Sequence, residues 1–170
     1  MKITIAYIVG IVALLVWSLS IQSKQKKKIL QAQIVANILY AIQYILIGVI
    51  VAGSMNMVSA FRCYFFYKEE EKKQKISAFW LFLFITIILI LAVITCKDLF
   101  SLIPIMITIL YTYATWQKNT KVIRIIFLVA ACIWVYYNVS VGAYVAVIGN
   151  IMEIVSSIVS MCRFDKKIKT

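Results

Sequence analysis

The sequence predicts an all-α polytopic membrane protein with seven transmembrane helices, an N-terminus outside the membrane and a cytoplasmic C-terminus. Of its 170 residues, 64% are hydrophobic and 14% are charged, and the mean hydropathy is +0.98. A soluble domain carries charge on roughly a quarter of its residues, so this chain could not cover its surface in water. Its apolar runs are continuous and mostly near the roughly 20 residues that a helix needs to cross a bilayer, which favours helices over spanning strands.

Seven apolar segments follow one another with short connections. They cover residues 3–21, 29–52, 55–67, 76–96, 99–116, 122–139 and 142–161. The division between the second and third segments depends on Gly53 and Ser54. Without a break there, the run would be far too long for one bilayer crossing. We therefore expect a turn at residues 52–54.

The positive charges support seven crossings. They cluster after the first, third, fifth and seventh segments: Lys24, Lys26, Lys27 and Lys28; Lys68, Lys72, Lys73 and Lys75; Lys118, Lys121 and Arg124; Arg163, Lys166, Lys167 and Lys169. Seven crossings put every cluster on one side of the membrane, and the positive-inside rule makes that side cytoplasmic. This topology, together with contact with the lipid bilayer, explains the net charge of +12 without any nucleic-acid partner.

The first segment differs from a secretory signal peptide in the order of its charges. A signal peptide carries its positive charge before the apolar stretch, with a small-residue cleavage site after it. Here a single Lys2 precedes the segment and the first lysine cluster follows it. We expect this segment to be retained as a membrane span.

The two ends of the chain are related by an internal repeat. A shift of 94 residues, the distance from Lys24 to Lys118, superposes them without a gap. The scarce residue types carry the signal: Gly48 falls on Gly142, Asn56 on Asn150, and Lys27 on Lys121. The first three segments align with the last three, a shift of four segments. Because four is an even number, both repeats have the same orientation in the membrane.

The repeat predicts a 3-1-3 arrangement of the chain. Residues 1–67 form the first triple-helix repeat, and residues 76–96 form a connector helix. Residues 99–162 form the second triple-helix repeat, and residues 163–170 a basic cytoplasmic tail.

Polar side chains follow one stripe of the third segment and one of the seventh. Asn56, Ser59 and Arg62 recur every three residues, and Asn150 and Glu153 do the same. Polar groups at bilayer depth face the bundle interior, pair with one another or line a hydrated path. Two Asn side chains related by a pseudo-twofold axis can hold a polar solute from both sides.

Aromatic residues accompany this pair at a matched distance. Tyr40 precedes Asn56 by sixteen residues, as Trp134 precedes Asn150. We therefore predict a substrate-binding set of Asn56, Asn150, Trp134, Tyr40 and Ser59. The alternative is that the polar groups hold helices together, at about 1 kcal/mol or less per hydrogen bond. Three further aromatic residues are typical of an interfacial belt: Tyr111, Tyr113 and Trp116.

Glu153 is the acidic residue predicted to lie within a span. A carboxylate there must take up a proton or find a cation, and Arg62 is the candidate partner. We predict a Glu153–Arg62 pair with a coupling or a structural role. The alternative leaves Glu153 protonated and lets Arg62 reach the inner head groups.

The sequence contains few of the residue types and motifs that are typical of catalytic sites. Histidine is absent, and the four cysteines show no metal-ligand spacing. No nucleophilic triad, phosphate loop or carboxylate pair is visible. We expect no enzymatic activity, no metal and no cofactor.

Several segments resemble the YgjV family of bacterial inner-membrane proteins. They are residues 17–24, residues 36–44, residues 55–62, Leu102-Ile103-Pro104 and residues 150–163. That family is in turn similar to the SWEET, SemiSWEET and PQ-loop transporters. This resemblance implies that Asn56, Asn150, Trp134 and Tyr40 occupy the sugar-contacting positions of SWEET proteins. The departures are the absence of a Pro-Gln pair and the single proline, Pro104, whose repeat counterpart is Gly10.

Together these features predict a carrier in the cell (inner) membrane, either a facilitator or proton-linked. It would move a small polar solute, such as a sugar or an amino acid, by alternating access between the two repeats. The alternative is a non-transporting membrane protein that serves as a lipid-binding or complex-assembly subunit. The sequence leaves the substrate, the coupling ion and homo-oligomer formation open.

Overall fold

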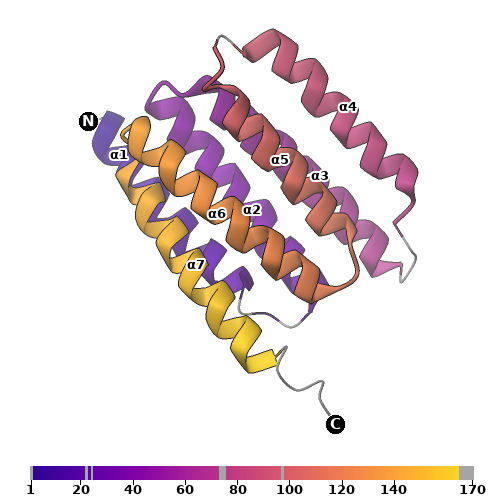
Figure 1. The fold of residues 1–170 in the computed structure, drawn as a ribbon. Helices are drawn as coiled ribbons and strands as arrows, with labels where there is room; N and C mark the ends of the chain where they lie inside the picture. The colour runs from indigo at the N-terminus through magenta and orange to yellow at the C-terminus, as the bar shows by residue number, and fades with distance from the viewer. Residues whose placement is uncertain (1, 22, 24, 73–75, 97, 165–170) are drawn as a thin grey trace.

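The computed structural model describes the chain except residues 1, 22, 24, 73–75, 97 and 165–170. The described residues form seven α-helices (Figure 1): α1 (Lys2–Ile21), α2 (Lys26–Leu46), α3 (Ile50–Glu71), α4 (Ala78–Thr95), α5 (Leu102–Trp116), α6 (Thr120–Ser140) and α7 (Tyr144–Phe164). Each of the seven predicted segments therefore corresponds to one helix. The basic tail, from residue 165 on, lies outside the described residues.

Five helices in the described part of the chain are long and apolar enough to cross a membrane: α1, α2, α4, α6 and α7. The α5 helix is apolar but has only 15 residues, and the 22-residue α3 carries Arg62 and a charged end. Large apolar side chains remain exposed on the outside, with Val93 and Leu99 each 85% exposed. These features fit a polytopic membrane protein whose outer surface meets lipid.

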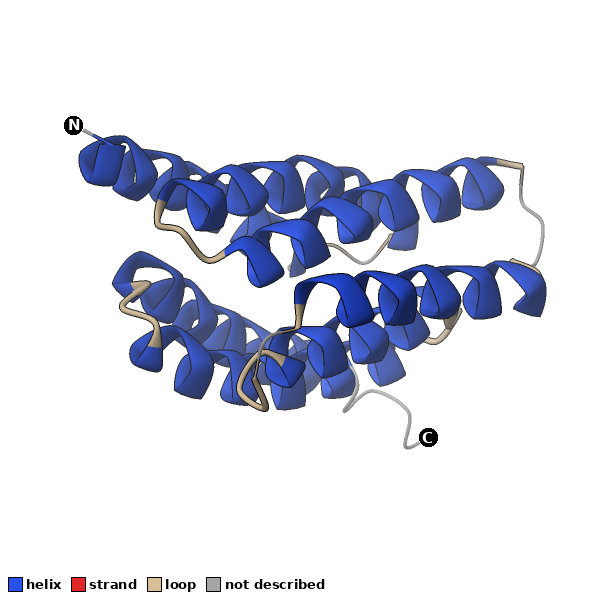
Figure 2. Cartoon of the chain, turned by 90° about the horizontal axis from the view of Figure 1, so that it is seen from above, coloured by secondary structure: helices blue, strands red, loops and turns tan. Residues whose placement is uncertain are grey.

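Six helices surround the centre of the molecule. The α2 helix packs between α1 and α3, and α6 packs between α5 and α7. Figure 2 shows two layers of helices, which meet where α1 contacts α7 and where α3 contacts α5. The remaining helix, α4, lies at one edge against α5 and α3 (Figure 1).

The turn between α2 and α3 differs from the prediction. It lies at residues 47–49 and not at residues 52–54, because Gly48 adopts a φ of 84°, which glycine allows at little cost. Gly53 instead lies inside α3. A Cβ atom there would be 2.8 Å from Ile45 Cγ1 and 3.3 Å from the carbonyl oxygen of Ala41. This glycine therefore marks a close approach of α3 to α2 and not a chain reversal.

The turn between α6 and α7 has the same backbone geometry. Gly142 has a φ of 72° and occupies the position that Gly48 holds in the first turn. The N–H of Val49 donates to the carbonyl of Tyr44 at 2.8 Å, and the N–H of Ala143 donates to that of Asn138 at 2.9 Å. The two donors, like the two acceptors, are separated by the 94-residue spacing found in the sequence.

The single proline lies where a helix tolerates it. The α5 helix begins at Leu102, so Pro104 falls within its first turn. N–H groups there have no partner inside a helix, so the missing donor costs little and no kink is required. The preceding turn is held by Asp98 Oδ1, which accepts hydrogen bonds from the Ser101 N–H and hydroxyl at 2.7 and 2.8 Å. These hydrogen bonds lower the pKa of the Asp98 carboxyl.

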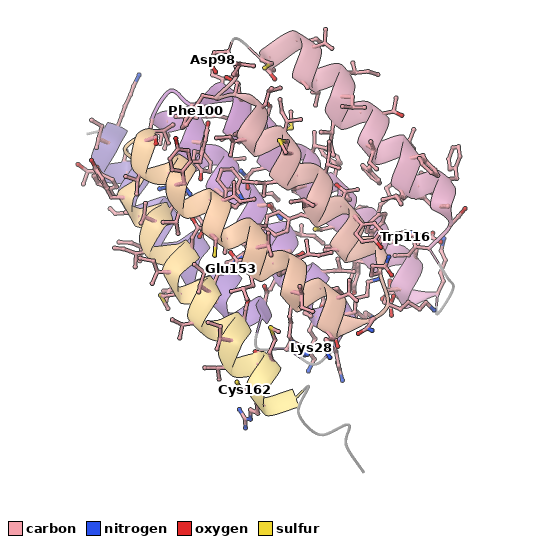
Figure 3. All side chains as sticks on the ribbon, in the orientation of Figure 1. Lys28, Asp98, Phe100, Trp116, Glu153 and Cys162 are labelled. Atoms are coloured by element: carbon pink, nitrogen blue, oxygen red, sulfur yellow. The ribbon has the colours of Figure 1, made fainter. Side chains whose placement is uncertain are left out.

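Basic residues gather at one end of the molecule. Lys28 and the helix end at Cys162 lie at the end opposite Asp98 and Phe100 (Figure 3). Lysines of α2 are paired there with glutamates of α3: Lys26 Nζ lies 3.7 Å from Glu70 and Lys27 Nζ 3.0 Å from Glu71. Six charges of the predicted pattern lie outside the described residues: Lys24, Lys73, Lys75, Lys166, Lys167 and Lys169.

We expect Gly53 and Gly48 to tolerate substitution differently. Gly53→Leu should lower the free energy of unfolding by about 1–3 kcal/mol, because the side chain collides with α2. A Cβ atom at Gly48 meets open space, so only the positive φ limits that site. Gly48→Asn should therefore be tolerated better than Gly48→Val, since asparagine visits this conformation more readily. Thermal unfolding in detergent measures both effects, and equal losses for the two Gly48 variants would contradict the role of φ.

Candidate functional site

A polar cavity lies at the centre of the six-helix arrangement. Its volume is about 40 Å³. It is lined by Trp17, Asn37, Tyr40, Tyr44, Asn56, Ser59, Thr108, Tyr111, Trp134, Asn138, Ala146, Asn150 and Glu153. A buried water needs roughly 10–15 Å³ measured in this way, so the cavity holds a few small atoms in this conformation.

Most lining residues form pairs related by the 94-residue spacing. The pairs are Trp17 and Tyr111, Tyr40 and Trp134, Tyr44 and Asn138, Asn56 and Asn150, and Ser59 and Glu153. Each pair contributes one residue from α1–α3 and one from α5–α7. The two halves of the chain therefore build the cavity from matching positions.

The predicted substrate-binding residues all line this cavity. Asn56 and Ser59 come from α3, Tyr40 from α2, Trp134 from α6 and Asn150 from α7. Ser59 is almost fully buried, whereas Asn56, Asn150 and Tyr40 keep part of their surface accessible. The structure thus brings together side chains that are as far as 110 positions apart, from Tyr40 to Asn150.

Glu153 also lines the cavity and is buried, with 1% of its surface exposed. Its Oε1 accepts a hydrogen bond from the Tyr111 hydroxyl at 3.2 Å. Trp17 and Asn150 line the same cavity. Figure 3 places Glu153 in the middle of the molecule, away from both ends.

Arg62 is buried as well, with 2% of its surface exposed, but it does not line the cavity. Its Nη1 donates to Thr112 Oγ1 at 2.7 Å and to the Thr108 carbonyl at 3.2 Å, both on α5. The predicted Glu153–Arg62 pair is absent from the ion pairs of the described residues. The physical reason is the packing: α3 lies against α5, while α7 lies against α1 and α6. The alternative for Arg62 does not hold either, since the guanidinium is buried and does not reach head groups.

The hydrogen bonds inside the cavity are asymmetric. The Tyr44 hydroxyl donates to Asn138 Oδ1 at 2.6 Å, and Asn138 Nδ2 donates to Asn150 Oδ1 at 2.8 Å. Asn56 Nδ2 donates to the carbonyl of Ala52 on its own helix at 2.8 Å. Asn150 is therefore held by a neighbouring helix, while Asn56 leaves its side-chain oxygen without a hydrogen bond from any described residue.

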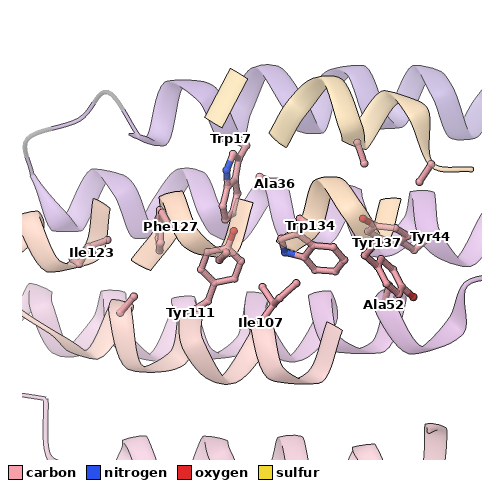
Figure 4. Close-up of a cluster of buried hydrophobic side chains, with 14 residues drawn as sticks. Trp17, Ala36, Tyr44, Ala52, Ile107, Tyr111, Ile123, Phe127, Trp134 and Tyr137 are labelled. Atoms are coloured by element: carbon pink, nitrogen blue, oxygen red, sulfur yellow. The ribbon is translucent and has the colours of Figure 1, made fainter. Parts of the chain in front are cut away.

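Aromatic rings form much of the cavity wall. Trp17 lies edge-on to Tyr111, with ring centroids 5.8 Å apart, and Tyr44 stacks on Trp134 at 5.9 Å. Figure 4 shows Trp17, Tyr111 and Phe127 as one group and Tyr44, Trp134 and Tyr137 as another. Tyr111 is thus part of the core and not of the interfacial belt predicted for it.

Several lining residues were not selected from the sequence as binding residues. They are Trp17, Asn37, Tyr44, Thr108, Tyr111 and Asn138. The 94-residue spacing relates Trp17 to Tyr111 and Tyr44 to Asn138. Each pair joins an aromatic residue to a second aromatic or polar one, so the spacing could have identified both pairs. Asn37 and Thr108 have apolar counterparts, Ala131 and Leu14, so the spacing gives no indication of them.

The cavity offers one carboxylate, amide groups, hydroxyls and aromatic faces. No lysine or arginine of the described residues lines it, and the same part of the chain contains no group of His, Cys, Asp or Glu side chains that could hold a metal ion. This chemistry suits the binding of a small polar molecule by hydrogen bonds and ring contacts.

The Tyr44–Asn138 hydrogen bond joins the two halves of the chain and predicts an energetic coupling. Tyr44→Phe should cost about 1 kcal/mol, and Asn138→Leu about 1–3 kcal/mol, since the second change leaves the buried Tyr44 hydroxyl and the half-buried Asn150 amide oxygen without their partner. The double variant should lose less than the sum of the two, because both changes break the same bond. Thermal or denaturant unfolding in detergent measures the cycle, and strict additivity would contradict the coupling.

The comparisons with known proteins give one result. The model of the bacterial inner membrane protein family Imp-YgjV matches residues 4–168. No curated protein and no solved structure matches the chain significantly. The match covers nearly the whole chain, and the helices long and apolar enough to span a membrane agree with it. The chain therefore belongs to the Imp-YgjV family and is a multi-pass protein of the bacterial inner membrane.

Proposed function

We propose that this protein is a carrier, a facilitator or proton-linked, for a small polar solute. The observation that carries the proposal is the central cavity, which the two halves of the chain line with matched polar and aromatic residues. A protein that needed only packing would gain little from a polar cavity at bilayer depth, where unsatisfied polar groups are costly.

The proposal includes two parallel triple-helix repeats, α1–α3 and α5–α7, joined by α4 as a connector. Their interfaces correspond, since α1 against α7 is matched by α5 against α3. Tyr44 and Asn138 occupy the same position in the two repeats and bond to each other, which is expected close to a pseudo-twofold axis. An axis along the membrane normal gives both repeats the same orientation, with the N-terminus outside and the C-terminus in the cytoplasm.

Alternating access would arise from the movement of one repeat against the other around the cavity. Asn56, Asn150 and Ser59 would hold the solute by hydrogen bonds, and Tyr40 and Trp134 would contact its faces. A cavity of about 40 Å³ is smaller than a sugar, so the structure corresponds in this proposal to a closed state. Glu153 would accept and release the proton if transport is proton-linked, and no residue is assigned a catalytic role.

Uptake into liposomes tests the carrier proposal. The purified protein is reconstituted and offered a panel of radiolabelled sugars, amino acids and other small metabolites. Asn150→Ala should reduce uptake of the transported solute at least tenfold, because it removes a cavity hydrogen-bonding group. Asn119→Ala is the matched control: this exposed residue caps α6 by accepting from the Lys121 N–H, far from the cavity. Its uptake should equal that of the wild type.

Correctly inserted, stable protein that takes up nothing from the panel would contradict the carrier proposal. The same result for wild type and both variants would favour a lipid-binding or complex-assembly subunit, in which the polar groups only hold helices together.

Access of water to the cavity gives a second test. In a background without native cysteines, Asn56→Cys and Asn150→Cys should react with a small water-soluble thiol reagent, because a carrier must open its site to water. Ala36→Cys is the control, since Ala36 is fully buried in the core and does not line the cavity. The reaction is followed by mass spectrometry in membranes, and protection of both Asn positions to the level of Ala36 would count against a hydrated site.

A further inference from the structure

The cavity contains one carboxyl side chain, that of Glu153. Among the lining residues that the structure describes, Glu153 is the only Asp, Glu, Lys or Arg. It is buried and accepts a hydrogen bond from Tyr111. A buried carboxylate without a basic neighbour needs a positive counter-charge, which must come from a proton or from a ligand.

The basic side chains near the centre are engaged elsewhere. Arg62 donates to Thr112 and to the Thr108 carbonyl, on the side of α5 that faces α3. Four lysines form ion pairs with glutamates near the end of α3: Lys26, Lys27, Lys68 and Lys72. No lysine or arginine of the described residues lines the cavity beside Glu153.

The remaining wall suits a cation. Five aromatic rings line the cavity: those of Trp17, Tyr40, Tyr44, Tyr111 and Trp134. The faces of such rings attract ammonium groups, most strongly when water is excluded. Asn56 adds a side-chain oxygen that accepts no hydrogen bond from any described residue and can receive one from an ammonium N–H.

We propose that the ligand of this cavity is a small organic cation with a primary ammonium group, bound between the Glu153 carboxylate and the aromatic rings. The inference rests on the proposed carrier function and names its substrate class. A sugar offers no positive charge to an ionised carboxylate, and a molecule with a free carboxylate would place two negative charges in one site. The volume of about 40 Å³ limits the ligand to a few non-hydrogen atoms in the closed state.

Direct binding tests the charge and the size together. The probe is radiolabelled ethylammonium, measured by equilibrium dialysis with the full-length protein in detergent. Ethanol is the neutral competitor of the same size, acetate the anionic one, and sodium chloride keeps the ionic strength constant. We expect saturable binding of ethylammonium that an excess of unlabelled ethylammonium displaces and that ethanol and acetate do not.

Three variants assign the binding to Glu153. Glu153→Gln keeps the size and removes the charge, and the Kd should rise at least tenfold. Glu153→Asp keeps the charge and should bind more weakly than wild type but more tightly than Glu153→Gln, which separates loss of charge from loss of folding. Glu71→Gln is the matched control, because it removes an exposed carboxylate at the end of α3 and should leave the Kd unchanged.

Three results would overturn the inference: no saturable binding of ethylammonium, equal displacement by ethanol, or a wild-type Kd for Glu153→Gln. The proposed function is judged separately from the uptake panel. If uptake of a neutral solute depends on Asn150 but ethylammonium does not bind, the cation proposal is rejected and the carrier proposal stands. If stable protein shows neither uptake nor ethylammonium binding, both the carrier proposal and the cation proposal are rejected.

Discussion

The structure depends on one constraint: polar side chains at bilayer depth must find their partners inside the helical bundle. The outer surface is rich in apolar side chains, whereas buried positions hold a carboxyl group, a guanidinium and several amides. Arg62 Nη1 finds its partners on hydroxyl and carbonyl groups of α5, and Asn138 bridges Tyr44 and Asn150. These contacts decide which helix faces point inward and place the polar cavity at the centre.

The two halves of the chain contribute residues at matching positions to the cavity. Five pairs of cavity-lining residues are separated by 94 positions, and the arrangement of helices places both members of each pair around the cavity. Two glycine turns of the same geometry, at Gly48 and Gly142, set the reversal of the chain in both halves. The counterparts are not identical, however. Ser59 corresponds to Glu153, so one half alone supplies the carboxyl group of the cavity.

That asymmetry distinguishes the polar groups that hold helices together from those that are available to a ligand. Most polar groups around the cavity are satisfied by neighbours, as expected of side chains that hold helices together. Glu153 has a hydrogen bond from Tyr111 but no basic partner among the described residues, and Asn56 keeps an unbonded oxygen. Groups that folding leaves unsatisfied are the ones through which a ligand can gain binding energy. For this reason the cavity, and not the apolar exterior, is the part of the molecule to which we assign a function.

The sequence by itself determined the membrane class, the seven helical segments and the 94-residue spacing that selected Asn56, Asn150, Tyr40, Trp134 and Ser59. Hydropathy and spacing are local or periodic properties, so one chain is enough to read them. Only the tertiary structure decided that Gly48, and not Gly53, makes the turn, that Arg62 bonds to α5, and that Asn37 and Thr108 line the cavity. These outcomes depend on which helices become neighbours, and periodicity along a helix carries no information about the helix packed against it.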